Sequence, residues 1–87
     1  MSSEAPGMNI SEVEVTNISA HGIWVLVSGK EYFMSYKDFP WFEEAPVGKI
    51  INVVELSSGH LYWRELDIDL SLESIKHPER FPLITKL

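Results

Sequence analysis

Three carboxylates near the C-terminal end of the sequence have the spacing of a cation site. Glu65, Asp67 and Asp69 alternate with aliphatic residues in the segment ELDIDL. On a β-strand, residues two apart share one face and lie about 7 Å apart, and hard cations such as calcium and magnesium prefer oxygen ligands. The segment lacks the glycine turn and the ligand spacing of a calcium-binding loop. We therefore expect solvated carboxylates on the outer face of a strand, and no bound metal or cofactor.

The three histidines, His21, His60 and His77, do not have the spacing of a metal-binding pair. A histidine site for zinc needs two or three converging ligands, whereas each of these residues falls at a predicted turn or helix end. One alternative stays open, because His60 precedes Asp67 and Asp69 closely enough for the three to meet near one hairpin end. Such a cluster would make the protein a small-molecule or metal-binding domain, accessory to an enzyme.

Nucleophilic catalysis finds no support in the sequence. The chain has no cysteine, which excludes thiolate nucleophiles, thiolate zinc sites and disulfides. Its serines do not occur in the G-x-S-x-G or S-x-x-K patterns that activate a hydroxyl. The tripeptide SGK at residues 28–30 lacks the rest of a phosphate-binding loop. We therefore expect a protein that is not an enzyme.

Aromatic residues are the most informative group, since they make up 11% of an 87-residue chain. Some must build the core, but FPWF at residues 39–42 lies beside a proline break, where burying every ring is difficult. Aromatic side chains dominate interface energetics and are enriched in binding hot spots. The predicted partner-binding residues, including two of the carboxylates, are Phe39, Trp41, Phe42, Trp63, Asp67 and Asp69.

The elements that must position these residues begin with an antiparallel meander. Residues 10–19 alternate apolar and polar side chains, which predicts a strand with one solvated face. The run IWVLV at 23–27 predicts a central strand covered on both faces. Ser28 and Gly29 provide a two-residue turn, after which residues 32–36 return as the antiparallel partner.

Short helices are predicted in the middle of the chain. Asp38 is expected to cap a first helical turn that contains Pro40, and Pro46 is expected to open a second helix. In that helix Val47, Ile50 and Ile51 share one face, and Gly48 weakens it by about 1 kcal/mol relative to alanine.

The C-terminal part is predicted to hold a hairpin, a strand and a closing helix. Ser58 and Gly59 mark the hairpin turn, and the strand runs through residues 65–70. Ser71 is expected to cap the helix, with Glu73 in its first turn. His77, which precedes a proline, is expected to end it.

The fold class is thus α+β: a small antiparallel sheet, made of an N-terminal three-stranded meander and a later hairpin, with one or two short helices and a C-terminal helix. We expect residues 10–87 to form a single domain after a flexible N-terminus at 1–9.

Charge narrows the partners that this domain could bind. Seven Lys and Arg residues against thirteen Asp and Glu residues give a net charge of −6, and the basic residues are scattered singly. Phosphate backbones require cationic patches, so we expect no direct nucleic-acid binding. No apolar run is long enough to cross a bilayer and no secretory signal is recognisable, so we expect a cytoplasmic protein without membrane contact. An acidic domain can still dock on a basic protein.

Three segments of the sequence are specific enough to indicate a family: FPWF, GHLYWRELDIDLSLESI and HPERFPL. With them, nearly the whole sequence after the first ten residues resembles the bacterial domain of unknown function family 2442. The resemblance implies a small α+β unit without an assigned catalytic residue. It also implies a setting in which some relatives are fused to a helix-turn-helix domain, or are encoded beside a small partner protein in arrangements like toxin–antitoxin pairs.

Together these features predict a non-catalytic protein-interaction module, antitoxin-like or a regulatory accessory domain. It would bind a partner protein, or a second copy of itself, through its aromatic surface and acidic face. The alternative is the small-molecule or metal-binding accessory domain built on His60, Asp67 and Asp69.

Overall fold

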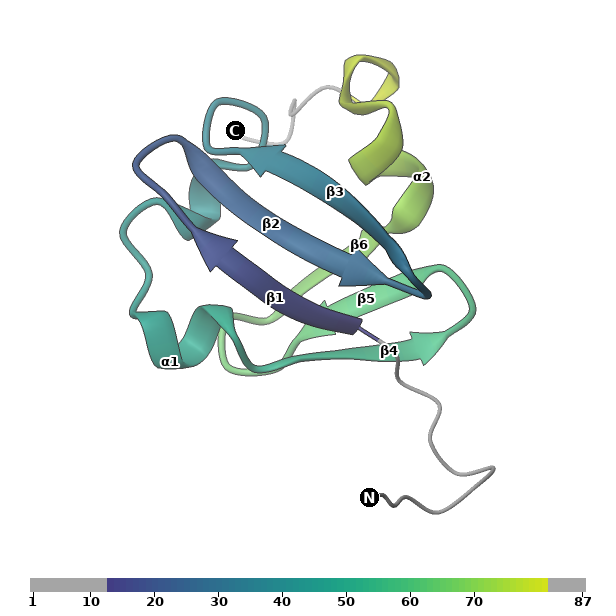
Figure 1. The fold of residues 1–87 in the computed structure, drawn as a ribbon, viewed down its shortest axis with the longest axis horizontal. Coiled ribbons are helices and arrows are strands. Elements are labelled where there is room, and N and C mark those ends of the chain that lie inside the picture. The colour runs from purple at the N-terminus through teal and green to yellow at the C-terminus, as the bar shows by residue number, and fades with distance from the viewer. Residues whose placement is uncertain (1–12, 82–87) are drawn as a thin grey trace.

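Two three-stranded antiparallel sheets, one lying behind the other, form the framework of the described residues (Figure 1). The computed structural model describes residues 13–81, so the predicted N-terminal segment 1–9 and the ends of the predicted domain lie outside the described residues. Sheet A has the strand order β1-β2-β3 and sheet B the order β4-β5-β6. The strands are β1 (Val13–Ile18), β2 (Gly22–Val27), β3 (Lys30–Ser35), β4 (Val53–Ser57), β5 (His60–Trp63) and β6 (Ile68–Ser71).

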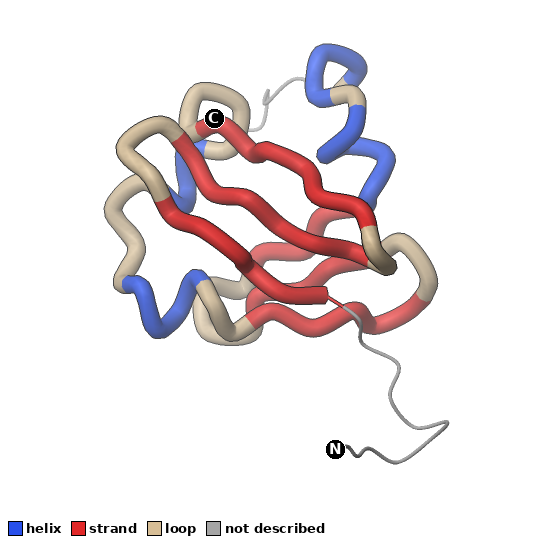
Figure 2. The backbone as a smooth tube through the Cα atoms, in the orientation of Figure 1, coloured by secondary structure: helices blue, strands red, loops and turns tan. Residues whose placement is uncertain are grey.

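Four short helical segments lie at the periphery of the two sheets (Figure 2). Two are 3₁₀ turns and two are α-helices of four and five residues. They are η1 (Pro40–Phe42), α1 (Val47–Ile50), α2 (Leu72–Lys76) and η2 (Pro78–Arg80). The predicted α+β class is confirmed, although the described part is mostly sheet.

Sheet A is the predicted meander. Ser28 and Gly29 have φ values of 49° and 86°, the left-handed conformations that a two-residue hairpin turn requires. The central strand β2 is covered on one face only, because Ile23, Val25 and Val27 are buried whereas Trp24 and Leu26 on the other face are half-buried. The prediction that both faces are covered was therefore wrong: sheet B lies on one side of sheet A alone.

Sheet B begins with the predicted hairpin, whose turn glycine, Gly59, has a φ of 80°. The next strand, β6, begins at Ile68 and pairs with β5, so sheet B has one strand more than the hairpin. Residues 64–67 form a turn in which Asp67 has a φ of 54°. The predicted strand over residues 65–70 was thus wrong at its start, because the chain needs those residues to reverse direction before β6. Aspartate tolerates the left-handed region better than most residues.

The closing helix α2 begins and ends as predicted. The Ser71 hydroxyl oxygen accepts a hydrogen bond from the Ser74 backbone N–H at 3.1 Å, which satisfies one of the unpaired donors at the helix start. Glu73 lies in the first turn. His77 is the C-terminal capping residue, and Pro78 then begins the 3₁₀ turn η2.

The middle of the chain departs from the predicted capping pattern. Phe39, rather than Asp38, is the N-terminal capping residue of η1, because the Asp38 carboxylate instead accepts a hydrogen bond from the Ser35 hydroxyl at 3.1 Å. Pro46 precedes α1 in an extended conformation and is not its first helical residue.

Only Ile50 of the predicted apolar face of α1 is buried, while Val47 and Ile51 are exposed. One turn of helix brings a single residue of this face onto the core, so the predicted three-residue contact was wrong.

The core lies between the two sheets and is closed at its ends by the helical segments. Trp63 is at its centre with no exposed surface. The Trp63 indole Nε1–H donates a hydrogen bond to the Ile50 carbonyl at 2.9 Å, and the Trp63 ring meets the Phe42 ring edge-on, with centroids 4.8 Å apart. The buried hydrophobic residues are Ile23, Val25, Val27, Met34, Phe39, Phe42, Ile50, Val53, Leu61, Trp63 and Ile75.

Within the described residues, no helix is long and apolar enough to span a membrane.

Candidate interaction surface

The predicted aromatic partner-binding residues divide between core and surface. Phe39, Phe42 and Trp63 are 4%, 1% and 0% exposed, so they hold the two sheets together and offer no area to a partner. Their inclusion in the predicted surface is corrected on this ground. Trp41 is 41% exposed, and its ring lies 6.3 Å from the ring of Phe39.

Asp67 and Asp69 are exposed, and both lie close to Tyr62. Asp69 is the register partner of Tyr62 on sheet B, and the Tyr62 hydroxyl donates a hydrogen bond to Asp67 Oδ1 at 3.2 Å. This hydrogen bond, which the phenol can donate only while protonated, and the negative charge of Asp67 raise the pKa of Tyr62 above its ordinary value of 10.0. The two carboxylates therefore lie on either side of one surface tyrosine. Their role in partner binding stays a prediction.

His60 lies away from Asp67. It begins β5 opposite Ser71, whereas Asp67 precedes Ile68, which pairs with the last residue of β5. These positions are three residues apart along the strand, or about 10 Å. Across residues 13–81, no group of three His, Asp or Glu side chains could hold a metal ion. The predicted meeting of His60, Asp67 and Asp69 was therefore wrong.

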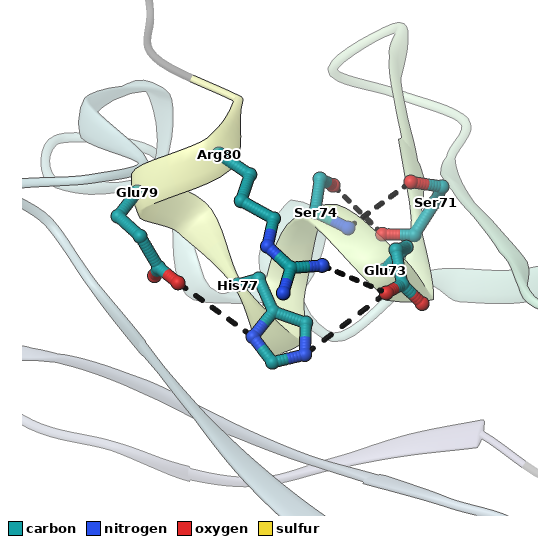
Figure 3. Close-up of polar contacts among 6 residues, drawn as sticks. All are labelled: Ser71, Glu73, Ser74, His77, Glu79 and Arg80. Carbon is teal, nitrogen blue, oxygen red and sulfur yellow. Dashed lines mark hydrogen bonds and ion pairs between the residues drawn. The ribbon is translucent and has the colours of Figure 1, made fainter.

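His77 belongs to a polar cluster at the end of α2 (Figure 3). Its Nε2 lies 4.0 Å from Glu73 Oε2 and its Nδ1 lies 3.6 Å from Glu79 Oε2, while Arg80 Nη1 lies 3.9 Å from the same Glu73 oxygen. These side chains are 40% to 70% exposed, where ion pairs contribute about 0–1 kcal/mol. Arg80 is the permanently charged cation of this cluster, which lies on the surface where α2 ends.

The outer face of sheet A carries an aromatic pair that the sequence analysis did not single out as a site. Trp24 and Phe33 are directly opposite each other on β2 and β3. Their ring centroids are 5.0 Å apart at an angle of 46°. Phe33 is 39% exposed, and Trp24 and Leu26 on the same face are half-buried. Among the described residues, no helix or loop crosses this side of sheet A (Figure 1).

The sequence held one signal for this pair. In a hairpin with a two-residue turn at Ser28 and Gly29, Trp24 and Phe33 are equally distant from the turn and must face each other. The continuous apolar run of β2 concealed the signal, because it resembles a strand covered on both faces.

Acidic side chains border this aromatic pair. Glu14 and Glu31 are the register partners of Leu26 on its two sides, and both are exposed. The Thr16 hydroxyl donates a hydrogen bond to Glu31 Oε2 at 2.6 Å, which orients that carboxylate across the sheet. We name the set Trp24, Leu26, Phe33, Glu14 and Glu31 the aromatic–acidic face.

An open hollow of about 390 Å³ adjoins Phe33 at one end of this face. It is formed where the turn between β1 and β2 meets the end of β3. Its lining residues are Ala20, His21, Phe33, Ser35, Tyr36, Lys37 and Glu43. The hollow extends the aromatic–acidic face with both apolar and polar groups.

The outer face of sheet B is more polar. Its central row is Val54, Tyr62 and Asp69, and the neighbouring pair on that face is His60 and Ser71. Tyr62 is the single aromatic residue of that row, whereas the outer face of sheet A carries two rings in contact, Trp24 and Phe33. The paired rings make the aromatic–acidic face the strongest candidate interaction surface.

Comparison with known proteins assigns the chain to a family but gives it no activity. No curated protein and no solved structure matches it. A family model described as "Protein of unknown function (DUF2442)" matches residues 12–81, a range that takes in every strand and helix that the structure describes, and the chain therefore belongs to the DUF2442 family.

Proposed function

We propose that this protein is a non-catalytic interaction module that docks a partner protein on the aromatic–acidic face. The observation that carries the proposal is the Trp24–Phe33 pair, which lies on a sheet face that no described element covers. Exposed aromatic area that is rimmed by polar residues is typical of protein interaction sites.

Energetics favour this face over the one predicted from the sequence. Aromatic side chains bring large contact area at low entropic cost and dominate interface hot spots. The three buried aromatic residues of the predicted surface are committed to the core, whereas Trp24 and Phe33 present part of their rings to solvent. Trp41 remains a predicted contact, because it too is partly exposed.

A non-catalytic role is supported by what the polar side chains do in the fold. Ser71 caps α2, Asp67 accepts the Tyr62 hydroxyl, and His77 closes a helix end. Each of these groups has a structural partner, and none of these contacts is a nucleophile–base pair of the kind that covalent catalysis needs.

The family resemblance adds the expectation that the partner is a small protein encoded nearby, as in a toxin–antitoxin pair or a regulatory complex. The net charge of −6 agrees with a basic partner, since charge complementarity speeds encounter and selects partners. We expect the encounter to take place in the cytoplasm.

Site-specific photo-crosslinking in the native host tests the proposal. A photoreactive phenylalanine analogue replaces Phe33 in one variant and Leu56 in a control, because Leu56 is 62% exposed on sheet B. We expect one defined crosslinked protein from position 33 and none from position 56. The absence of a product at position 33, in cells where a known complex is crosslinked efficiently by the same analogue, would refute the proposal.

A further inference from the structure

We propose that the aromatic–acidic face recognises a basic polypeptide segment by stacking an arginine side chain on Trp24 and pairing its guanidinium with Glu31 or Glu14. The inference rests on the proposed function and names the chemistry of the partner. It follows from three features of the described residues: the register of sheet A, the carboxylate held by Thr16, and the charge of the chain.

The register places an apolar platform between two carboxylates. Glu14, Leu26 and Glu31 form one row across the three strands of sheet A. Adjacent strands lie about 4.8 Å apart, so the two glutamates start about 10 Å from each other. Trp24 precedes Leu26 by two residues on β2 and lies on the same face of sheet A, about 7 Å away. A long cationic side chain that lies over the platform therefore has an aromatic ring and a carboxylate within reach together.

The Glu31 carboxylate is directed toward this platform. The hydrogen bond from the Thr16 hydroxyl to Glu31 Oε2 spans the sheet from β1 to β3, so the carboxylate lies over β2 between the two outer strands. A carboxylate that is already ordered loses less side-chain entropy when a cation binds.

Arginine fits these groups better than lysine. Its guanidinium is planar, stacks on aromatic faces and presents a fork of donors to a carboxylate. A cation over a tryptophan ring also gains from the ring quadrupole. Lysine supplies only a compact, strongly hydrated charge.

The same charges disfavour other occupants. A second copy docked face to face would bring the glutamates of two chains together, and each chain carries a net charge of −6. Like charges placed across an interface are unfavourable. A phosphate backbone would meet the same repulsion.

An NMR titration tests the inference. The probe is an acetylated and amidated peptide of alternating arginine and glycine, added to the isotope-labelled full chain at low salt. We expect shifts of the Trp24 indole signal and of sheet A amides, and weaker binding of the lysine–glycine counterpart by about twofold or more. Raising the salt should weaken both peptides, because exposed ion pairs are screened.

Matched variants separate specific pairing from general charge attraction. Glu31→Gln keeps an acceptor for the Thr16 hydroxyl but removes the charge, and it should weaken the arginine peptide by about threefold. Glu65→Gln likewise keeps an acceptor, for the Asn52 amide, and removes one charge from the turn before β6, and it should leave the affinity within about 1.5-fold. Trp24→Leu should also weaken binding about threefold, whereas Leu56→Ala, at an exposed position of sheet B, should not. Amide spectra confirm that each variant is folded.

Equal losses of affinity in Glu31→Gln and Glu65→Gln, or chemical-shift changes confined to sheet B, would overturn the inference. So would a crosslink from position 33 to a second copy of the chain. A different result is a partner that is crosslinked at position 33 while its affinity is unchanged by Glu31→Gln and by added salt. That result would support the proposed function and refute only the arginine-binding assignment. Loss of every crosslink would remove both.

Discussion

A pair of glycine-to-alanine substitutions tests the packing of this fold. From the structure we expect one substitution to lower the free energy of unfolding and the other to raise it. Gly22 begins β2 and is buried. A Cβ built there would lie 2.7 Å from Phe33 Cζ and 2.8 Å from Ser35 Cα, and it would also collide with the Met34 carbonyl oxygen. Two of these three atoms belong to the backbone of β3, so the strands themselves must move apart.

Overpacking of a core costs about 1–3 kcal/mol, and contact with backbone places Gly22→Ala near the upper end of that range. Alanine also restricts the unfolded chain, which returns about 0.4–1 kcal/mol. We expect a net loss of about 2 kcal/mol in the free energy of unfolding. For a domain of this size the melting temperature should fall by roughly 8–16 °C.

Gly48 is the matched control. It lies in α1, and a Cβ there would meet nothing within 4 Å. Alanine is favoured over glycine in helices by about 0.8–1.0 kcal/mol, and since α1 has only four residues we expect Gly48→Ala to stabilise by about 0.5 kcal/mol.

Equilibrium urea unfolding, followed by the fluorescence of the three tryptophans, measures both free energies. A Gly22→Ala protein within about 0.5 kcal/mol of the parent chain would refute the close approach of β2 and β3, since surface substitutions already produce changes of that size. A Gly48→Ala protein less stable than Gly22→Ala would refute the assignment of the two environments.

The remaining predictions concern the helix cap, the surface tyrosine and the core. Ser71→Ala should cost about 1 kcal/mol of unfolding free energy in the same assay, and an unchanged stability would show that the hydroxyl does not cap α2. Asp67→Asn should lower the pKa of Tyr62 toward 10.0, because the largest cause of its rise is the Asp67 carboxylate; tyrosine carbon NMR shifts measure it, and an unchanged pKa would contradict the hydrogen bond. By linkage, a raised folded-state pKa stabilises the protein in full below pH 10, and this part of the stability disappears as the pH rises through that pKa. Leu61→Ala, at a site with no exposed surface, should cost about 3–5 kcal/mol, and Leu70→Ala, which is half-buried, about 2 kcal/mol; equal losses would contradict their different burial.

Features that depend on neighbouring residues were predictable from the sequence. The turn at Ser28 and Gly29 and the cap at Ser71 each follow from the chemistry of one or two residues, and the structure places them as predicted. The meander was predictable because short turns connect neighbouring antiparallel strands, independently of how the rest of the chain packs.

Features that depend on what covers a strand were not predictable. An apolar run such as that of β2 does not say whether one or two layers cover it, so the outward position of Trp24 and Leu26 emerged only with the second sheet. Similarly, the alternation around Asp67 is compatible with either a strand or a turn. The same uncertainty about coverage led to the prediction of Phe39 and Trp63 as surface residues, whereas packing between the sheets buries them.

The separation of the two sheets along the chain has a consequence for the order of folding. Every strand pair in both sheets joins neighbours in the sequence, so each hairpin can close over a short loop at low entropic cost. Hairpins of this kind form in about 1–10 μs. The core contact between Trp63 and Phe42, by contrast, joins sheet B to the segment that connects the two sheets. We therefore expect the sheets to form early and to dock late, so that weakening this contact would speed unfolding more than it slows folding.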